Sequence, residues 1–136
     1  MDNFVFRNPT RILFGRDTED AVGEETAKYA RKVLIHYGGG SILKSGLFER
    51  VVESLRQAGV SYVELGGVQP NPRLSLVQEG IRLCREHGVE LILAVGGGSA
   101  IDSAKAIAMG VPYDGDVWDF YAGRKRPFDA LPVATV

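Results

Sequence analysis

Short hydrophobic runs alternate along this chain with segments in which apolar residues recur at helical spacing. Five short runs predict β-strands: 11–15, 33–37, 61–66, 91–96 and 131–136. Three segments between them have an apolar stripe of the kind seen in amphipathic helices: 47–59, 73–88 and 96–110. Residues 17–29 also begin with the acidic side chains typical of a helix N-terminus, although Gly23 interrupts the pattern.

Regular alternation of strands and helices predicts an α/β fold, with a parallel sheet that carries helices on both faces. Gly59 and Gly88 follow two of the predicted helices at the position where helices commonly end. The connections between the predicted elements are short, and no segment is repeated or of low complexity. In such sheets ligands bind beyond the carboxyl ends of the strands.

Three glycine-rich or polar loops follow predicted strands, at 38–41, 66–72 and 96–99. Glycine lets the backbone approach a phosphate closely, and the helix that follows adds its partial positive charge. A pyrophosphate would therefore fit on the N–H groups of Gly97, Gly98 and Ser99.

A purely structural explanation of these loops is equally open at this point. Ser99 and Asp102 match an S-x-x-D capping box, which requires no ligand. Neither triplet completes the G-x-G-x-x-G/A dinucleotide fingerprint, because Leu43 and Ile101 stand where the last small residue belongs. Spacing alone therefore favours neither nucleotide binding nor a tight turn.

Composition narrows the classes of protein that this chain can represent. It has 136 residues, 45% of them hydrophobic, enough for one domain with a real core. A net charge of −1 gives no electrostatic argument for nucleic acid or an anionic membrane as partner. No apolar run reaches the roughly 18 residues of a membrane span, and the N-terminus does not resemble a signal peptide. We expect a cytoplasmic protein.

Few side chains offer chemistry of their own. Cys84 is the single cysteine, which excludes an internal disulfide, and its position on an apolar helix face predicts a core residue. His36 and His87 lie far apart and form no metal-binding motif, so we predict no metal site in this chain. Trp118, Phe120 and Tyr121 predict a hydrophobic patch that closes the domain or meets a second one.

Four segments together resemble the N-terminal domain of the iron-containing (group III) alcohol dehydrogenases, closest to the butanol dehydrogenase branch. They are 4-FVFRNPTRILFG-15, 36-HYGGGSILKSG-46, 69-QPNP-72 and 95-VGGGSAIDSAKAIA-108. The resemblance covers essentially the whole chain and implies a Rossmann-like sheet of the dehydroquinate synthase type. It also implies that residues 1–136 are an NAD(P)-binding domain, truncated within a strand. The family's helical C-terminal domain, which carries an Asp and three His as metal ligands, has no counterpart here.

The resemblance assigns the first glycine loop to the adenosine ribose of the cofactor. Members that prefer NAD tend to have an Asp at the position of Gly38, which Gly39 and Ser41 follow closely. Without a carboxylate the loop would not repel a 2′-phosphate, so the resemblance admits NADP(H) as well as NAD(H). We expect a preference for NADP(H).

Five further residues take cofactor-binding roles by the same resemblance. Asn71 matches a residue near the middle of the cofactor. Gly97, Gly98 and Ser99 match the pyrophosphate loop, and Asp102 matches a carboxylate near the nicotinamide end. The resemblance assigns no catalytic residue and no metal ligand to this chain.

The implied reaction of the full-length parent is reversible hydride transfer between a primary alcohol or aldehyde and NAD(P). A divalent metal, iron or zinc, would polarise the substrate oxygen there, and this fragment alone would be inactive. Two alternatives stay open: a lyase domain like that of dehydroquinate synthase, and a non-catalytic nucleotide-binding module. The apolar stretch 4–15 suggests a possible homodimer.

Overall fold

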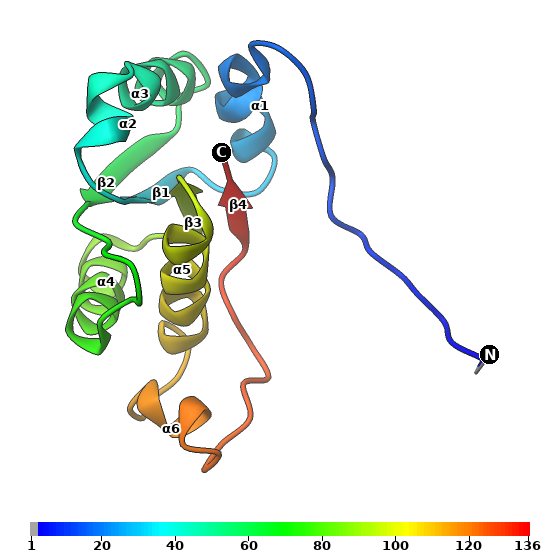
Figure 1. Cartoon of the computed structure of the whole chain (residues 1–136), viewed down its shortest axis with the longest axis vertical. Helices are drawn as coiled ribbons and strands as arrows, with labels where there is room; N and C mark the ends of the chain where they lie inside the picture. Colours follow the sequence, from blue (N-terminus) through cyan, green and yellow to red (C-terminus); the bar gives the residue numbers. More distant parts are fainter. Residues whose placement is uncertain (1–2) are drawn as a thin grey trace.

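Four parallel strands form the centre of the computed structural model, which describes residues 3–136. The strands are β1 (Lys32–Tyr37), β2 (Ser61–Leu65), β3 (Leu91–Val95) and β4 (Val133–Thr135). They lie in the order β2-β1-β3-β4, and every neighbouring pair is parallel. The predicted α/β fold with a parallel sheet is confirmed, and the last four predicted strands match the observed ones to within two residues (Figure 1).

Helices cover both faces of this sheet, as predicted. On one face lie the 3-10 turn η1 (Thr18–Ala21) and the helices α1 (Val22–Ala27), α2 (Gly40–Lys44) and α3 (Leu47–Gln57). On the other face lie α4 (Leu74–His87) and α5 (Gly98–Gly110), and Figure 1 shows the two groups separated by the sheet. A short helix, α6 (Trp118–Tyr121), follows α5.

Alternation along the central strands divides the core into two layers. Val33 and Ile35 of β1 pack with the first group of helices, whereas Leu34 between them packs with α4 and α5. All five residues of β3 are buried because helices cover both of its faces. This is why β3 has a continuous apolar sequence rather than an alternating one.

The predicted strand at 11–15 is wrong. Residues 3–14 adopt no helix or strand, and within 3–136 no strand pairs with them. Ile12 and Phe14 are 76% and 98% exposed, so the apolar run is not part of this core. A hydrophobic run forms a strand only where a neighbour accepts its backbone hydrogen bonds.

Gly23 lies inside α1 and does not break it. A Cβ at this position would overlap the backbone carbonyl of Ser54, so only glycine lets α1 approach α3 this closely. The Gly23 N–H donates to Ser54 Oγ at 2.9 Å, and that hydroxyl donates to the Asp20 carbonyl at 2.6 Å. The glycine that looked like an interruption in the sequence is a packing contact.

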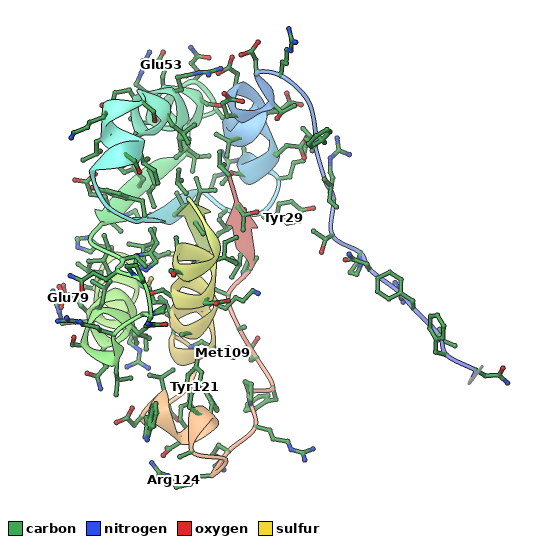
Figure 2. The ribbon with its side chains drawn as sticks, viewed as in Figure 1. Tyr29, Glu53, Glu79, Met109, Tyr121 and Arg124 are labelled. Carbon is green, nitrogen blue, oxygen red and sulfur yellow. The ribbon has the colours of Figure 1, made fainter. Side chains whose placement is uncertain are left out.

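The aromatic patch around α6 closes the domain only in part. Phe120 packs against the α4 and α5 layer, as one of the two predicted roles requires. Trp118 and Tyr121 stack on each other with ring centroids 5.9 Å apart, but about half of each side chain is exposed. Figure 2 shows Tyr121 and Arg124 at the end of the molecule opposite Glu53. No helix within residues 3–136 is both long and apolar enough to cross a bilayer.

Candidate functional site

The order of the strands creates a switch point between β1 and β3. From β1 the chain crosses to β2 on one side and then returns to β3 on the other. The two strands end level, with Tyr37 of β1 opposite Val95 of β3. Gly38–Gly40 and Gly96–Gly98 directly follow these residues, so both glycine triplets lie at the switch point. Crevices of this kind are where open α/β sheets bind ligands.

Backbone geometry requires glycine at only one of these positions. Gly96 has φ +134°, a conformation that other residues rarely adopt, and a Cβ there would lie 3.1 Å from Cδ1 of Ile42. A Cβ on Gly39, Gly97 or Gly98 would meet no atom within 4 Å, and none of the three has a left-handed φ. A Cβ on Gly38 would make an ordinary 3.8 Å contact with the Val68 carbonyl oxygen.

This contrast separates the two explanations that the sequence left open. Turn geometry accounts for Gly96, but the packing of this chain does not account for the bare backbone at Gly38, Gly39, Gly97 and Gly98. All four positions lie at the carboxyl edge of the sheet. A ligand that must come close to the backbone is a sufficient reason for glycine at these positions.

Unpaired N–H groups face this edge at the start of α5. Gly97 is the N-cap residue, and its carbonyl accepts hydrogen bonds from the N–H groups of Ala100 and Ile101 at 3.0 and 3.2 Å. Within residues 3–136 no acceptor pairs with the N–H groups of Gly97, Gly98 or Ser99. The 13-residue helix adds its N-terminal partial charge, and together these features suit an anion.

The predicted capping box is wrong. Gly97, not Ser99, is the N-cap residue, and no side chain caps α5. Ser99 and Asp102 therefore both lie within the helix, where their spacing cannot form the reciprocal bonds of a capping box. Asp102 is exposed, and its carboxylate lies 4.0 Å from Nζ of Lys105. Neither the Ser99 side chain nor the Asp102 side chain therefore caps α5.

The structure brings most of the sequence-predicted residues to one edge. Ser41 is exposed in the first turn of α2, directly after the first triplet. Asn71 is exposed in the loop after β2, with φ +60°. This loop is joined to the first triplet, because the Gly67 N–H donates to the Gly38 carbonyl at 3.3 Å. Asp102 lies about one turn farther along α5 than Ser99.

His36 joins three elements below this edge. The residue is fully buried on β1, and its Nδ1 lies 2.8 Å from the Leu65 carbonyl oxygen of β2. A carbonyl only accepts, so Nδ1 carries the proton and donates. Nε2 is then free to accept from Ser103 Oγ of α5 at 2.7 Å. Desolvation by burial lowers the pKa of His36, which keeps the ring neutral.

This lowered pKa predicts that acid destabilises the fold. Histidine in the unfolded chain titrates near 6.5, so below that pH the unfolded state binds a proton that the folded state resists. The contribution of His36 to the free energy of unfolding is therefore fully present above pH 6.5, and it is lost as the pH decreases toward 5. Urea denaturation at pH 7.5 and 5.5 measures this loss, and His36→Gln removes most of it. An equal loss in His36→Gln would contradict the assignment.

The described residues do not fit a metal centre. Within residues 3–136 no three side chains of His, Cys, Asp or Glu lie close enough to hold a metal ion. Cys84 is 1% exposed on α4, and burial raises the pKa of its thiol to about 12. Its predicted role as a core residue is confirmed.

Lys44 is a feature of this edge that the sequence did not reveal. It ends α2, and its Cε lies 3.9 Å from the position that a Cβ on Gly40 would take. Lys44 is exposed and forms no ion pair within residues 3–136. The short helix α2, which places this side chain beside Gly40, was not predicted. The position of Lys44 in the sequence therefore gave no reason to select it.

Comparison with known proteins finds one family along nearly the whole chain. The model for iron-containing alcohol dehydrogenase matches residues 9–136. The chain is 50% identical over 136 residues to a probable NADH-dependent butanol dehydrogenase of Bacillus subtilis. It is 39% identical over 139 residues to an NADPH-dependent aldehyde reductase of Escherichia coli.

Solved structures agree with this result. The crystal structure of NADH-dependent butanol dehydrogenase A from Thermotoga maritima superposes with a TM-score of 0.95 at 50% identity. It covers 99% of this chain, which in turn covers 34% of that one. The enzymes of Bacillus subtilis and Escherichia coli each match all of this chain with 35% of their own length. The chain thus spans about a third of the length of the curated relatives it matches.

Proposed function

The chain belongs to the iron-containing alcohol dehydrogenase family, and from this premise we propose that residues 1–136 form the NAD(P)-binding domain of such an enzyme. The proposed cofactor-binding residues are Gly38, Gly39, Ser41, Asn71, Gly97, Gly98, Ser99 and Asp102. Gly97, Gly98 and Ser99 would bind the pyrophosphate through their N–H groups. Gly38, Gly39 and Ser41 would face the adenosine ribose.

One observation supports this proposal more than any other. Four glycines at the switch point have room for a side chain and an ordinary backbone, so the packing of the chain does not explain them. A bound dinucleotide explains all four, because its ribose and pyrophosphate must approach the backbone closely. The proposed roles of Asn71 and Asp102 are supported by the resemblance and by their exposure at the same edge.

The test is a fluorescence titration of the 136-residue chain with NADH and NADPH. The expected result is saturable binding of both nucleotides, with one site per chain and tighter binding of NADPH. Failure of both nucleotides to bind at millimolar concentration would contradict the proposal.

Lys44 supports the proposed preference for NADP(H). Its ammonium group is on α2, which begins at the last glycine of the first triplet, and the loop offers no carboxylate to repel a 2′-phosphate. The relatives do not decide the question, since the probable butanol dehydrogenase is named NADH-dependent and the aldehyde reductase NADPH-dependent. We therefore propose that the domain accepts both cofactors and binds NADP(H) more tightly.

Replacing Lys44 with Gln should weaken NADPH binding by about 10-fold and leave NADH binding within about 2-fold. The reason is that only NADPH carries the phosphate that the ammonium would pair with. Lys125→Gln serves as the matched control, because Lys125 is also exposed but follows α6, away from the carboxyl edge of the sheet. Equal loss for both nucleotides would show that Lys44 does not recognise the 2′-phosphate.

For the full-length parent we propose reversible hydride transfer between a primary alcohol or aldehyde and NAD(P). The cofactor supplies the hydride chemistry, and the residues of this domain would bind and orient it. A divalent metal, iron or zinc, would be held by residues outside this chain, because residues 3–136 bring no suitable ligands together. A cytoplasmic location and a homodimer are further parts of this proposal.

Because the metal ligands would lie outside this chain, we expect no turnover by the isolated chain. Purified chain mixed with butanal, NADPH and Fe²⁺ or Zn²⁺ should show no decrease in absorbance at the NADPH band. The reason is that residues 3–136 bring together no ligands for a metal ion that would polarise the substrate oxygen. Measurable turnover would contradict the proposal.

The family match favours this reaction over a lyase of the dehydroquinate synthase type and over a non-catalytic module, since the matching family is named for alcohol dehydrogenation.

A further inference from the structure

We propose that His36 is a positioning residue of the dinucleotide site, which holds the three site loops in one fixed arrangement. This inference rests on the proposed function, because it concerns the affinity of that site. His36 lies two residues before Gly38 on β1. Leu65 is the last residue of β2, directly before the loop that contains Asn71. Ser103 lies on α5, five residues after Gly98.

One imidazole therefore connects all three elements that carry the loops. Its Nδ1–H donates to the Leu65 carbonyl at 2.8 Å, and its Nε2 accepts from the Ser103 hydroxyl at 2.7 Å. Both side chains are buried, at 0% exposure for His36 and 1% for Ser103. Water cannot replace either partner at these positions, so each bond must be kept by the protein.

The packing of α5 explains why such a bond matters. The buried residues of α5 are mainly small, including Ala100 and Ala104. Small side chains interlock weakly with a neighbouring element, so they limit sliding along the helix axis less than large ones do. A directional bond between Ser103 and His36 fixes that axial position. The same position sets how far the N–H groups of Gly97 and Gly98 lie from the first triplet.

An apolar residue at position 36 would fill the core equally well, as the other buried residues of β1 do. It would not connect β1 to Ser103 or to the Leu65 carbonyl. The two hydrogen bonds therefore add geometric definition rather than hydrophobic stability. If His36 had only a structural role, its replacement would lower the free energy of unfolding as other core substitutions do. The affinity for the nucleotide would then change no more than in those variants.

The experiment is a titration of the 136-residue chain with NADPH, alongside urea denaturation of each variant. Asparagine at position 36 can donate to the Leu65 carbonyl but is too short to reach Ser103. We expect His36→Asn and Ser103→Ala each to weaken NADPH binding by about 10-fold. The double variant should also lose about 10-fold, because both substitutions remove the same bond. His36→Gln, which can reach Ser103, should restore affinity to within about 3-fold of the wild type.

Val51→Ala is the matched control, since Val51 is fully buried in the core on the opposite face of the sheet from His36 and Ser103. It should lower stability while leaving NADPH affinity unchanged. The inference is overturned if His36→Asn and Ser103→Ala bind NADPH as tightly as this control. It is also overturned if the two losses multiply to about 100-fold. Absence of binding by the wild-type chain would instead overturn the proposed function, and this inference with it.

Discussion

Replacing Gly98 with Ala should weaken NADPH and NADH binding by about 100-fold while leaving the fold slightly more stable. Gly98 is the first residue of α5, where a Cβ would meet no atom of the protein within 4 Å. The new methyl group would project into the space proposed for the pyrophosphate. Loss of two charge-assisted hydrogen bonds, worth about 1.5 kcal/mol each, corresponds to the expected change in affinity.

The opposite signs of the two effects make this variant informative. Alanine is a better helix former than glycine, so urea denaturation should show a gain of roughly 0.5 kcal/mol in the free energy of unfolding. A variant that simply damaged the fold would lose both stability and affinity. If Gly98→Ala bound both nucleotides as tightly as the wild type, the pyrophosphate would not lie on this helix end.

Replacing Gly38 with Asp should reverse the cofactor preference. A carboxylate there would face the 2′-phosphate of NADPH, and such a juxtaposition of like charges costs several kcal/mol, enough to weaken NADPH binding about 100-fold. The same carboxylate would accept hydrogen bonds from the ribose hydroxyls of NADH and improve its binding roughly 10-fold. The backbone tolerates the change, because a Cβ on Gly38 would make only an ordinary 3.8 Å contact.

Gly38→Asn provides the uncharged control for this experiment. Asn has the same size as Asp but does not repel a phosphate, so its effect on NADPH binding should be within about 5-fold of the wild type. Parallel titrations with NADH and NADPH give the change in affinity for each nucleotide relative to the wild type. An unchanged NADPH preference in Gly38→Asp would show that the first triplet does not face the ribose.

The sequence predicted most of the fold because its periodicity was clear. The runs at 33–37 and 91–96 became central strands, and the helix at 73–88 ended at Gly88 in the expected left-handed conformation, with φ +64°. The run at 11–15 failed because hydrophobicity reports the need for burial but not the presence of a pairing strand. The order of the strands could not be predicted from the sequence either, and this order creates the switch point.

The candidate site was only partly predictable for similar reasons. Glycine spacing drew attention to Gly97 and Gly98, but only backbone angles could separate them from Gly96, which the turn itself requires. Ser99 and Asp102 have the spacing of a capping box, yet α5 begins two residues too early for it. His36 was considered only as a metal ligand, because its partners Leu65 and Ser103 are distant in sequence.

The most direct test of the central claim maps NADPH binding onto individual backbone amides. In two-dimensional ¹H–¹⁵N NMR spectra of the labelled chain, the N–H groups proposed to bind the pyrophosphate should show the largest shifts on titration. These are the amides of Gly97, Gly98 and Ser99, with smaller shifts at Gly38 and Gly39. Saturable shifts at these positions are the predicted result. Saturable shifts confined to other parts of the chain, or none at millimolar NADPH, would contradict the account.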